Sequence, residues 1–172
     1  PPSTKLPISQ SIRNTFIIFH PGSHGNGREW PLKKYIECCK ILQNTKYHII
    51  LTGSKQEDHR IGKEISLACP YVTNLMGKLT IEQLMFLTKK ASALIASGTG
   101  PLHLAAAIGI PALGLFPKKK IIGPHRWGTL GKQGCILASK GCRGCRSAES
   151  CLCMHDITAT QVATWVKSLA QE

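Results

Sequence analysis

A loop of small and hydroxyl residues, Ser97 to Gly100, stands between a short apolar run and an Ala-rich helix pattern. Such a junction between a strand and a helix points free backbone N–H groups, and the positive end of the helix dipole, at one spot. A phosphate suits that spot, and glycine lets the backbone come close to it. Thr99 adds a hydroxyl donor, and His103 follows on the first turn or so of the helix. The sequence therefore predicts a nucleotide-binding loop.

Two further polar loops follow predicted strands. Residues 20–28 form a glycine-rich turn after the first strand, and residues 53–57 follow the second. In a parallel α/β sheet, ligands bind at the carboxyl ends of the strands, where the strand order reverses. We expect these loops and the loop at Ser97 to converge on one cleft. Ser23 and Thr99 should then lie on the same side of the sheet.

Apolar runs and helical patterns alternate along the whole chain, which predicts an α/β fold, a doubly wound parallel sheet covered on both faces. We expect strands at residues 16–19, 48–52, 72–75, 93–96, 112–116 and 135–138. Helices are expected after Pro31, from about Gln56 to Ala68, from Thr80 to Ala91, after the Ser97 loop and from about Thr158. Thr80 has the character of an N-cap residue.

Length and composition fit one domain. The chain has 172 residues, of which 42% are hydrophobic, enough for a single core. Residues 1–15 carry two positive charges and no apolar segment of the signal-peptide type. We interpret residues 1–15 as a linker or ragged end and residues 16–172 as the domain, cut from a longer protein. No apolar run approaches the roughly 20 residues of a membrane span.

The formal net charge is +13, which favours anionic partners such as nucleotides, phosphorylated glycans, acidic lipid headgroups or nucleic acid. A segment without acidic residues, from Lys118 to Arg146, holds much of this charge. Each of its cations taken alone fits a solvated loop. We interpret the group as attraction to an anionic surface or substrate. Its basic residues are Lys118, Lys119, Lys120, Arg126, Lys132, Lys140, Arg143 and Arg146.

The eight cysteines fall into two groups. The first group is expected to be small core residues: Cys38, Cys39, Cys69 and Cys135. The second forms the pattern C-x2-C-x5-C-x-C: Cys142, Cys145, Cys151 and Cys153. A structural zinc site stays open for this second group, although C-x-C is tighter than the usual C-x2-C pair. We favour a thiol cluster over zinc, and a disulfide framework is disfavoured because no secretion signal is present.

The joint order of several motifs resembles the carboxyl-terminal half of the lipopolysaccharide heptosyltransferases, the ADP-heptose enzymes of glycosyltransferase family 9. The match runs from Phe16 onward and includes the Cys-rich tail. Its motifs are HPGS at 20–23, basic-x-Trp-Pro at 28–31, GSxxE at 53–57, Gly-x-Leu-Thr-x-Glu at 77–82 and TGPLHLAAA at 99–107. The resemblance implies a Rossmann-like, three-layer domain with a mostly parallel sheet, the second half of a GT-B glycosyltransferase.

The resemblance also implies residues that bind the donor, ADP-heptose or a related nucleotide-sugar. Ser23 and Arg28 would meet the diphosphate. Thr99 and Gly100 would bind phosphate through the helix N-terminus, and His103 would lie near the diphosphate and the sugar. Arg28 stands where the family usually has Lys, and its guanidinium can grip two oxygens where Lys offers a point charge.

The remaining donor contacts would come from Glu57, accepting hydrogen bonds from the ribose hydroxyls, and from Leu79, beside the adenine. The chain departs from the family at Gly98, where the family usually has Asp. One acidic contact to the donor sugar is then missing, so the identity of that sugar is left open.

The family's N-terminal domain, which binds the acceptor and supplies the catalytic carboxylate, has no counterpart in these residues. The resemblance implies an inverting transfer in which a base of that domain deprotonates a hydroxyl of the lipid A–core acceptor as ADP leaves. Arg28, Thr99 and the helix N-terminus would stabilise the departing diphosphate without a metal or other cofactor. We expect this chain to bind donor weakly and to transfer nothing alone. The implied place is the bacterial cytoplasm, peripheral to the inner face of the inner membrane, near the lipopolysaccharide acceptor.

Taken singly, these residues have simpler interpretations. His103 also fits a buried, hydrogen-bonded histidine, Glu57 a plain helix-start acid and Trp30 a packing residue. Two other functions also stay open. A basic, zinc-binding nucleic-acid module would use the late cysteines, but aromatic residues for base stacking are scarce at 6%, so no nucleic acid is expected. Another Rossmann-type sugar-nucleotide enzyme would need GxGxxG after the first strand, and the glycines of residues 20–28 lack that spacing.

Overall fold

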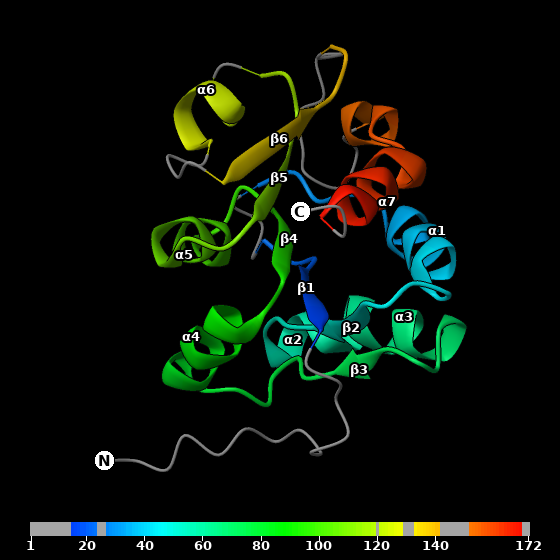
Figure 1. Ribbon diagram of the computed structural model, residues 1–172. Helices are drawn as coiled ribbons and strands as arrows, with labels where there is room; N and C mark the ends of the chain where they lie inside the picture. The colour runs from blue at the N-terminus through cyan, green and yellow to red at the C-terminus, as the bar shows by residue number, and fades with distance from the viewer. Residues whose placement is uncertain (1–14, 24–26, 120, 129–132, 142–151, 170–172) are drawn as a thin grey trace.

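The computed structural model describes residues 15–23, 27–119, 121–128, 133–141 and 152–169 (Figure 1). The predicted linker at residues 1–15 lies, apart from Thr15, outside the described residues. Three of the four late cysteines, Cys142, Cys145 and Cys151, also lie outside them.

Six strands form one sheet in the order β3-β2-β1-β4-β5-β6, and all of its neighbouring strands pair in parallel. From the centre of the sheet, β1, β2 and β3 follow one another toward one edge, and β4, β5 and β6 toward the other. The strand order therefore reverses between β1 and β4. The prediction of a doubly wound parallel sheet is confirmed. The strands are β1 (Phe16–His20), β2 (His48–Leu51), β3 (Thr73–Asn74), β4 (Ala93–Ser97), β5 (Ala112–Phe116) and β6 (Gly134–Ala138).

Helices cover both faces of the sheet (Figure 1). On one face lie α1 (Leu32–Leu42), α3 (Lys63–Ala68) and α7 (Ala159–Ser168), and on the other lie α4 (Ile81–Lys90) and α5 (Gly100–Ile108). Because successive strand residues point to opposite faces, Ile17 and Phe19 pack toward α1 and α7. Phe16 and Ile18 pack toward α4 and α5. Burial on both faces explains why the central strands are apolar throughout.

Side chains at the helix starts fix where two helices begin. Thr80 caps α4 and Thr158 caps α7, each in a reciprocal capping box with the glutamine three residues on. The helix predicted at 56–68 consists of α2 (Lys55–Glu57), a π-helical turn (Asp58–Gly62) and α3. Leu67 is 81% exposed and Ala68 packs on the core instead. The sequence did not predict the short helix α6 (Pro124–Trp127) or the 3₁₀ helix (Leu152–Asp156).

Cysteines fill space in the core. Cys38, Cys39 and Cys69 are buried free thiols, and Cys135 is partly buried against the same core. Burial raises the pKa of the Cys38 thiol to about 12, so this side chain behaves as an apolar residue. Cys153 is also buried in this core. Among the described residues, no group of three or more His, Cys, Asp or Glu side chains could hold a metal ion.

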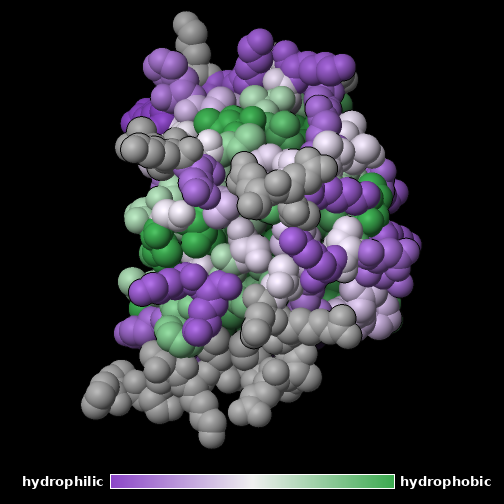
Figure 2. Space-filling view, in the orientation of Figure 1, coloured by the Kyte–Doolittle hydropathy of each residue, from purple (hydrophilic) through white to green (hydrophobic). Residues whose placement is uncertain are grey.

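The outer surface is mixed in character. Figure 2 shows hydrophilic side chains spread across this face of the molecule, with apolar groups between them. Within the described part of the chain, every helix is too short or too polar to cross a membrane.

Trp30 ties the beginning of α1 to the segment before α7. Its indole Nε1 donates a hydrogen bond to the Ile157 carbonyl oxygen at 2.9 Å, and its ring meets the Tyr35 ring edge-on at 4.7 Å between centroids. Trp30 is only 2% exposed. The interpretation of Trp30 as a packing residue is confirmed, and its contact joins segments far apart in the sequence.

Replacing Trp30 by Phe should lower the free energy of unfolding by about 2–3 kcal/mol, because it leaves a buried carbonyl without its donor and opens a small cavity. The same replacement at Trp127, which is 45% exposed and also donates to a carbonyl, should cost under about 1 kcal/mol. Urea unfolding of both variants measures the difference. Equal losses would contradict the assigned role of Trp30.

Candidate functional site

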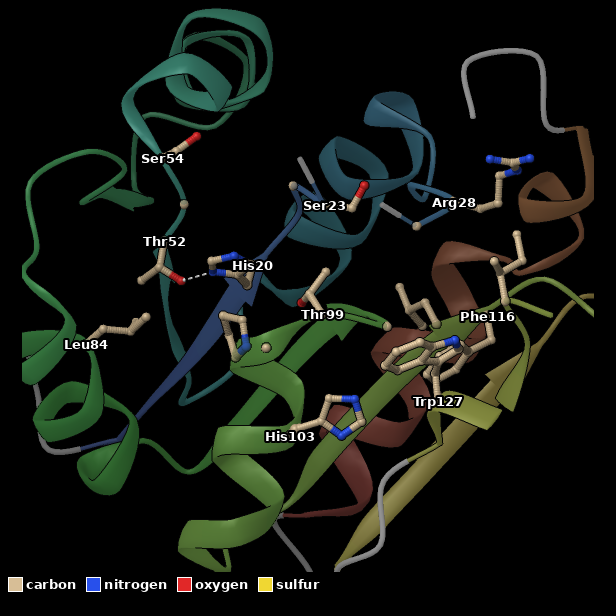
Figure 3. A pocket seen from close by; sticks show the side chains of 18 of the residues that line it. His20, Ser23, Arg28, Thr52, Ser54, Leu84, Thr99, His103, Phe116 and Trp127 are labelled. Atoms are coloured by element: carbon tan, nitrogen blue, oxygen red, sulfur yellow. Dashed lines mark hydrogen bonds between the residues drawn. The ribbon is translucent and has the colours of Figure 1, made fainter. Parts of the chain in front are cut away.

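A cavity of about 870 Å³ opens at the carboxyl edge of the sheet (Figure 3). Residues that end four strands or follow them directly contribute to its wall: His20 of β1, Thr52 after β2, Gly98 after β4 and Phe116 of β5. The carboxyl ends of parallel strands meet at one edge of the sheet. Because the strand order reverses between β1 and β4, the helices after these two strands lie on opposite faces and leave a crevice between them. The expected convergence of the strand-end loops is therefore present.

Most of the residues proposed for donor binding line this cavity. Ser23 and Thr99 are on the same side of the sheet, as expected (Figure 3). Their roles toward a donor stay predictions, since the structure holds no ligand. The six that line the cavity are Ser23, Arg28, Leu79, Thr99, Gly100 and His103.

The loop at Thr99 has the geometry of an anion site. Thr99 is the N-cap of α5 in an extended conformation, and its hydroxyl donates to the Ser97 carbonyl oxygen at 3.2 Å. A Cβ placed on Gly100 would meet no atom within 4 Å, so the backbone there faces open space. A Cβ on Gly98 would overlap the Phe116 ring, so that ring, rather than a side chain of residue 98, occupies this part of the wall. Pro101 has no N–H, and the Leu102 N–H donates to the Thr99 carbonyl oxygen at 3.1 Å, so this loop offers an anion the backbone at Gly100 and the positive end of the helix dipole.

The loop after β1 brings one cation to the cavity wall and one carboxylate to Ser23, which lines the cavity. Arg28 lines the cavity, and its Nε is buried without a hydrogen-bond partner. Beside it, Glu29 accepts two hydrogen bonds from Ser23, one from the backbone N–H and one from the hydroxyl, each at 3.1 Å to Oε1. Its Oε2 pairs with Nη2 of Arg60 at 2.6 Å. Burial, and then the Glu29 carboxylate, raise the pKa of the Tyr35 phenol, which stays neutral.

Glu57 does not reach the cavity wall. It is 4% exposed, and its Oε2 accepts hydrogen bonds from the Ser54 backbone N–H at 2.8 Å and from the Ser54 hydroxyl at 2.9 Å. These contacts complete the capping box that starts α2. A Cβ on Gly22 would overlap its carboxylate, so Glu57 lies directly beneath Gly22, which does line the cavity. The helix-start interpretation of Glu57 is what the structure shows, and its contact with ribose stays a prediction.

Around His103 and Arg126 the cavity has a wall of aromatic and apolar side chains that the sequence did not predict. The rings of His103 and Trp127 lie 6.5 Å apart between centroids, and the Arg126 guanidinium lies 5.7 Å from the Trp127 ring centroid. His103 is partly exposed, so its interpretation as a buried core histidine is wrong. No pattern singled out Trp127, because the short helix α6 that carries it lies within an irregular basic segment. The wall's members are His103, Phe116, Ile121, Ile122, Arg126 and Trp127.

The ends of β1 and β2 also meet through a polar contact. The expectation that ligands bind at the carboxyl ends of parallel strands could have predicted it. Thr52 Oγ1 and His20 Nδ1 share a hydrogen bond at 2.9 Å, and both side chains are buried at the cavity floor. None of the described residues that line the cavity is acidic, whereas Arg28 and Arg126 are cationic. The cavity therefore favours an anionic ligand with an apolar portion.

Comparisons with known proteins agree with this architecture. The model of glycosyltransferase family 9 (heptosyltransferase) matches residues 4–154. Lipopolysaccharide heptosyltransferase 2 of Salmonella typhimurium is 33% identical over 115 residues, which cover 63% of this chain and 33% of that protein. The Escherichia coli protein of the same name is 32% identical over 115 residues, with the same coverage. The chain thus spans about a third of the length of these relatives.

Solved structures give the same result. The structure of E. coli ADP-heptose lipopolysaccharide heptosyltransferase II matches with a TM-score of 0.72 and 25% identity, over 92% of this chain and 47% of that one. E. coli heptosyltransferase WaaC with ADP matches with a TM-score of 0.73 and 19% identity, over 90% of this chain and 44% of that one, which shows a shared fold. The predicted α/β, GT-B-type fold is confirmed, and neither the nucleic-acid module nor another sugar-nucleotide enzyme is favoured. With the family model covering most of its length, the chain belongs to glycosyltransferase family 9, the heptosyltransferases.

Proposed function

We propose that this chain is the donor-binding domain of an ADP-heptose:lipopolysaccharide heptosyltransferase. The whole enzyme would transfer a sugar, with inversion, from a nucleotide-sugar to the lipid A–core oligosaccharide. The observation that carries the proposal is the meeting of Arg28, the Thr99–Gly100 helix start and His103 in one cavity at the strand reversal. Membership of the family supports the reaction class.

The cavity suits a nucleotide-sugar in size and in the distribution of polar groups. Its volume of about 870 Å³ is within the range of small-molecule sites, about 300–1,000 Å³. The diphosphate would lie between Arg28 and the start of α5, where the Gly100 backbone faces open space at the positive end of the helix dipole. The adenine would lie by Leu79, and the ribose by Gly53 and Ser54, above Glu57.

The sugar would then lie toward His103 and Trp127. As the bond to the sugar breaks, negative charge grows on the departing diphosphate. Arg28 and the α5 N-terminus are fixed before the reaction, so they stabilise that charge without reorganising. The hydroxyl that attacks the sugar would lose its proton to a base of the acceptor-binding domain. In this scheme the residues of this chain need no metal to stabilise the leaving group.

The partners and place in the cell follow from the same proposal. Two E. coli structures are described as heptosyltransferase WaaC with ADP and with ADP-2-deoxy-2-fluoro heptose, which supports an adenine nucleotide-sugar as donor. The acceptor would be the lipopolysaccharide core, held by the N-terminal domain of the same enzyme at the inner face of the bacterial inner membrane. Cations in the β5–β6 region would favour that phosphorylated surface: Lys118, Lys119, Arg126 and Lys140.

Calorimetric titration should detect ADP binding to this chain, and Arg28→Ala should weaken it by about 10- to 100-fold because a charge-assisted contact to phosphate is lost. Thr99→Ala should weaken it by about threefold, since the backbone donors remain. Lys89→Ala, which removes an exposed charge outside the cavity lining, is the matched control and should change little. NAD and a short DNA duplex serve as control ligands. Absence of ADP binding beside tight, salt-sensitive DNA binding would overturn the proposal.

The chain alone should transfer no sugar, and transfer should appear once an acceptor-binding domain of the family is fused before it. In the fused enzyme, Arg28→Ala should lower kcat by about 100-fold or more, because the leaving diphosphate loses a fixed cation. Product formation from ADP-heptose with a lipopolysaccharide core acceptor measures this rate. An unchanged kcat in the Arg28 variant would show that the cation serves binding alone.

A further inference from the structure

The Glu29 carboxylate occupies a place where an anionic ligand would be expected. Ser23 lines the cavity and is 3% exposed, and both of its hydrogen-bond donors are used by Glu29 Oε1. A backbone N–H and a hydroxyl that converge on one oxygen form the kind of cradle that binds phosphate. Ser23 therefore keeps only its hydroxyl lone pairs for a ligand, which suit a sugar hydroxyl rather than a phosphate.

The carboxylate is held firmly in this place. Its second oxygen pairs with the Arg60 guanidinium from the π-helical turn, and the Glu29 side chain is only 19% exposed. Arg60 itself is 58% exposed, so water screens its charge more than it screens that of Glu29. A carboxylate less screened than its partner is therefore fixed against Ser23, which lines the cavity.

The loop that carries Glu29 lies against the proposed phosphate site. A Cβ on Gly27 would lie 3.5 Å from the Ser23 Cβ and 3.9 Å from the Gly98 carbonyl oxygen. Gly98 directly precedes Thr99, the N-cap of α5. Ser23, which holds the Glu29 carboxylate, and the loop before the α5 N-terminus thus lie at the same end of the cavity. The carboxylate repels negative charge and the helix dipole attracts it.

We propose that Glu29 is a specificity-determining residue that selects ligands by charge, favouring a nucleotide-sugar over a nucleotide with a free terminal phosphate. This inference rests on the proposed donor-binding function. In a nucleotide-sugar the diphosphate is esterified at both ends. In free ADP the terminal phosphate ionises a second time near neutral pH and adds negative charge. Glu29 repels this added charge, so the cavity holds the donor and releases the nucleotide left after transfer.

The test compares the affinities of ADP and ADP-ribose, an available nucleotide-sugar, by calorimetry at low salt. Glu29→Gln removes the charge and keeps an oxygen that accepts from Ser23. It should tighten ADP about three- to fivefold relative to ADP-ribose, the size expected for unit charges roughly 8–10 Å apart in a partly screened site. ATP, with a further charge, should gain more. Added salt should shrink the difference.

Two further variants make the result specific. Glu37→Gln changes the net charge by the same amount, but Glu37 is 51% exposed on α1 and outside the cavity lining. The ratio of the ADP affinity to the ADP-ribose affinity should therefore not change in this variant. Arg60→Met removes the cation that partly neutralises Glu29, so it should shift the ratio the other way, against ADP. Because Arg60 is exposed, this variant decides the question even if Glu29→Gln fails to fold.

The outcomes separate the possible failures. An equal change for both ligands in Glu29→Gln would mean that Glu29 only holds the loop, and would overturn the inference. An equal shift in Glu37→Gln would assign the effect to net charge and overturn it as well, as would an unchanged ratio in Arg60→Met. If the unmodified chain binds neither nucleotide, the proposed function fails and this inference fails with it.

Discussion

Parallel pairing of β1 with β4 places the loops that follow these two strands beside each other. Ile18 of β1 aligns with Leu94 of β4, and His20 aligns with Ala96, so both strands end at the same height. The loop after β1 carries Ser23 and Arg28, and the loop after β4 carries the start of α5. Ser23, Arg28 and the α5 N-terminus meet at the cavity because of this register, since a parallel sheet brings all carboxyl ends to one edge.

Groups that attract negative charge and a group that repels it lie close together at this edge of the sheet. Arg28 and the α5 N-terminus attract negative charge, and none of the described lining residues is acidic. Glu29 adds one carboxylate beside the cavity and fixes it with Ser23 and Arg60. Under the proposed function, the site would hold a doubly esterified diphosphate and release a more highly charged product, and both kinds of group would serve it. Fixed groups also act without reorganisation when charge develops during transfer.

Local patterns were enough to predict most of the elements. Thr80 and Thr158 begin helices because each side chain accepts a hydrogen bond from the backbone three residues on, a contact contained within one turn. The central strands are apolar on both faces, which is a property of their own few residues. Local signals failed at residues 56–68, where a π-helical turn interrupts the helix, and at 124–127, where a short helix has no periodicity to reveal it.

The candidate site was predictable to the extent that motifs follow strands. Alternating apolar and helical patterns predicted the α/β class, and the order of the motifs predicted the family. The resemblance to that family implied the donor-binding residues, of which Ser23, Arg28, Leu79, Thr99, Gly100 and His103 line the cavity. Tertiary structure alone decided the rest. The Glu57 carboxylate lies beneath Gly22, Trp127 faces His103, and Glu29 meets an arginine 31 residues away. These contacts depend on where side chains from distant segments meet, and no local pattern in the sequence encodes that.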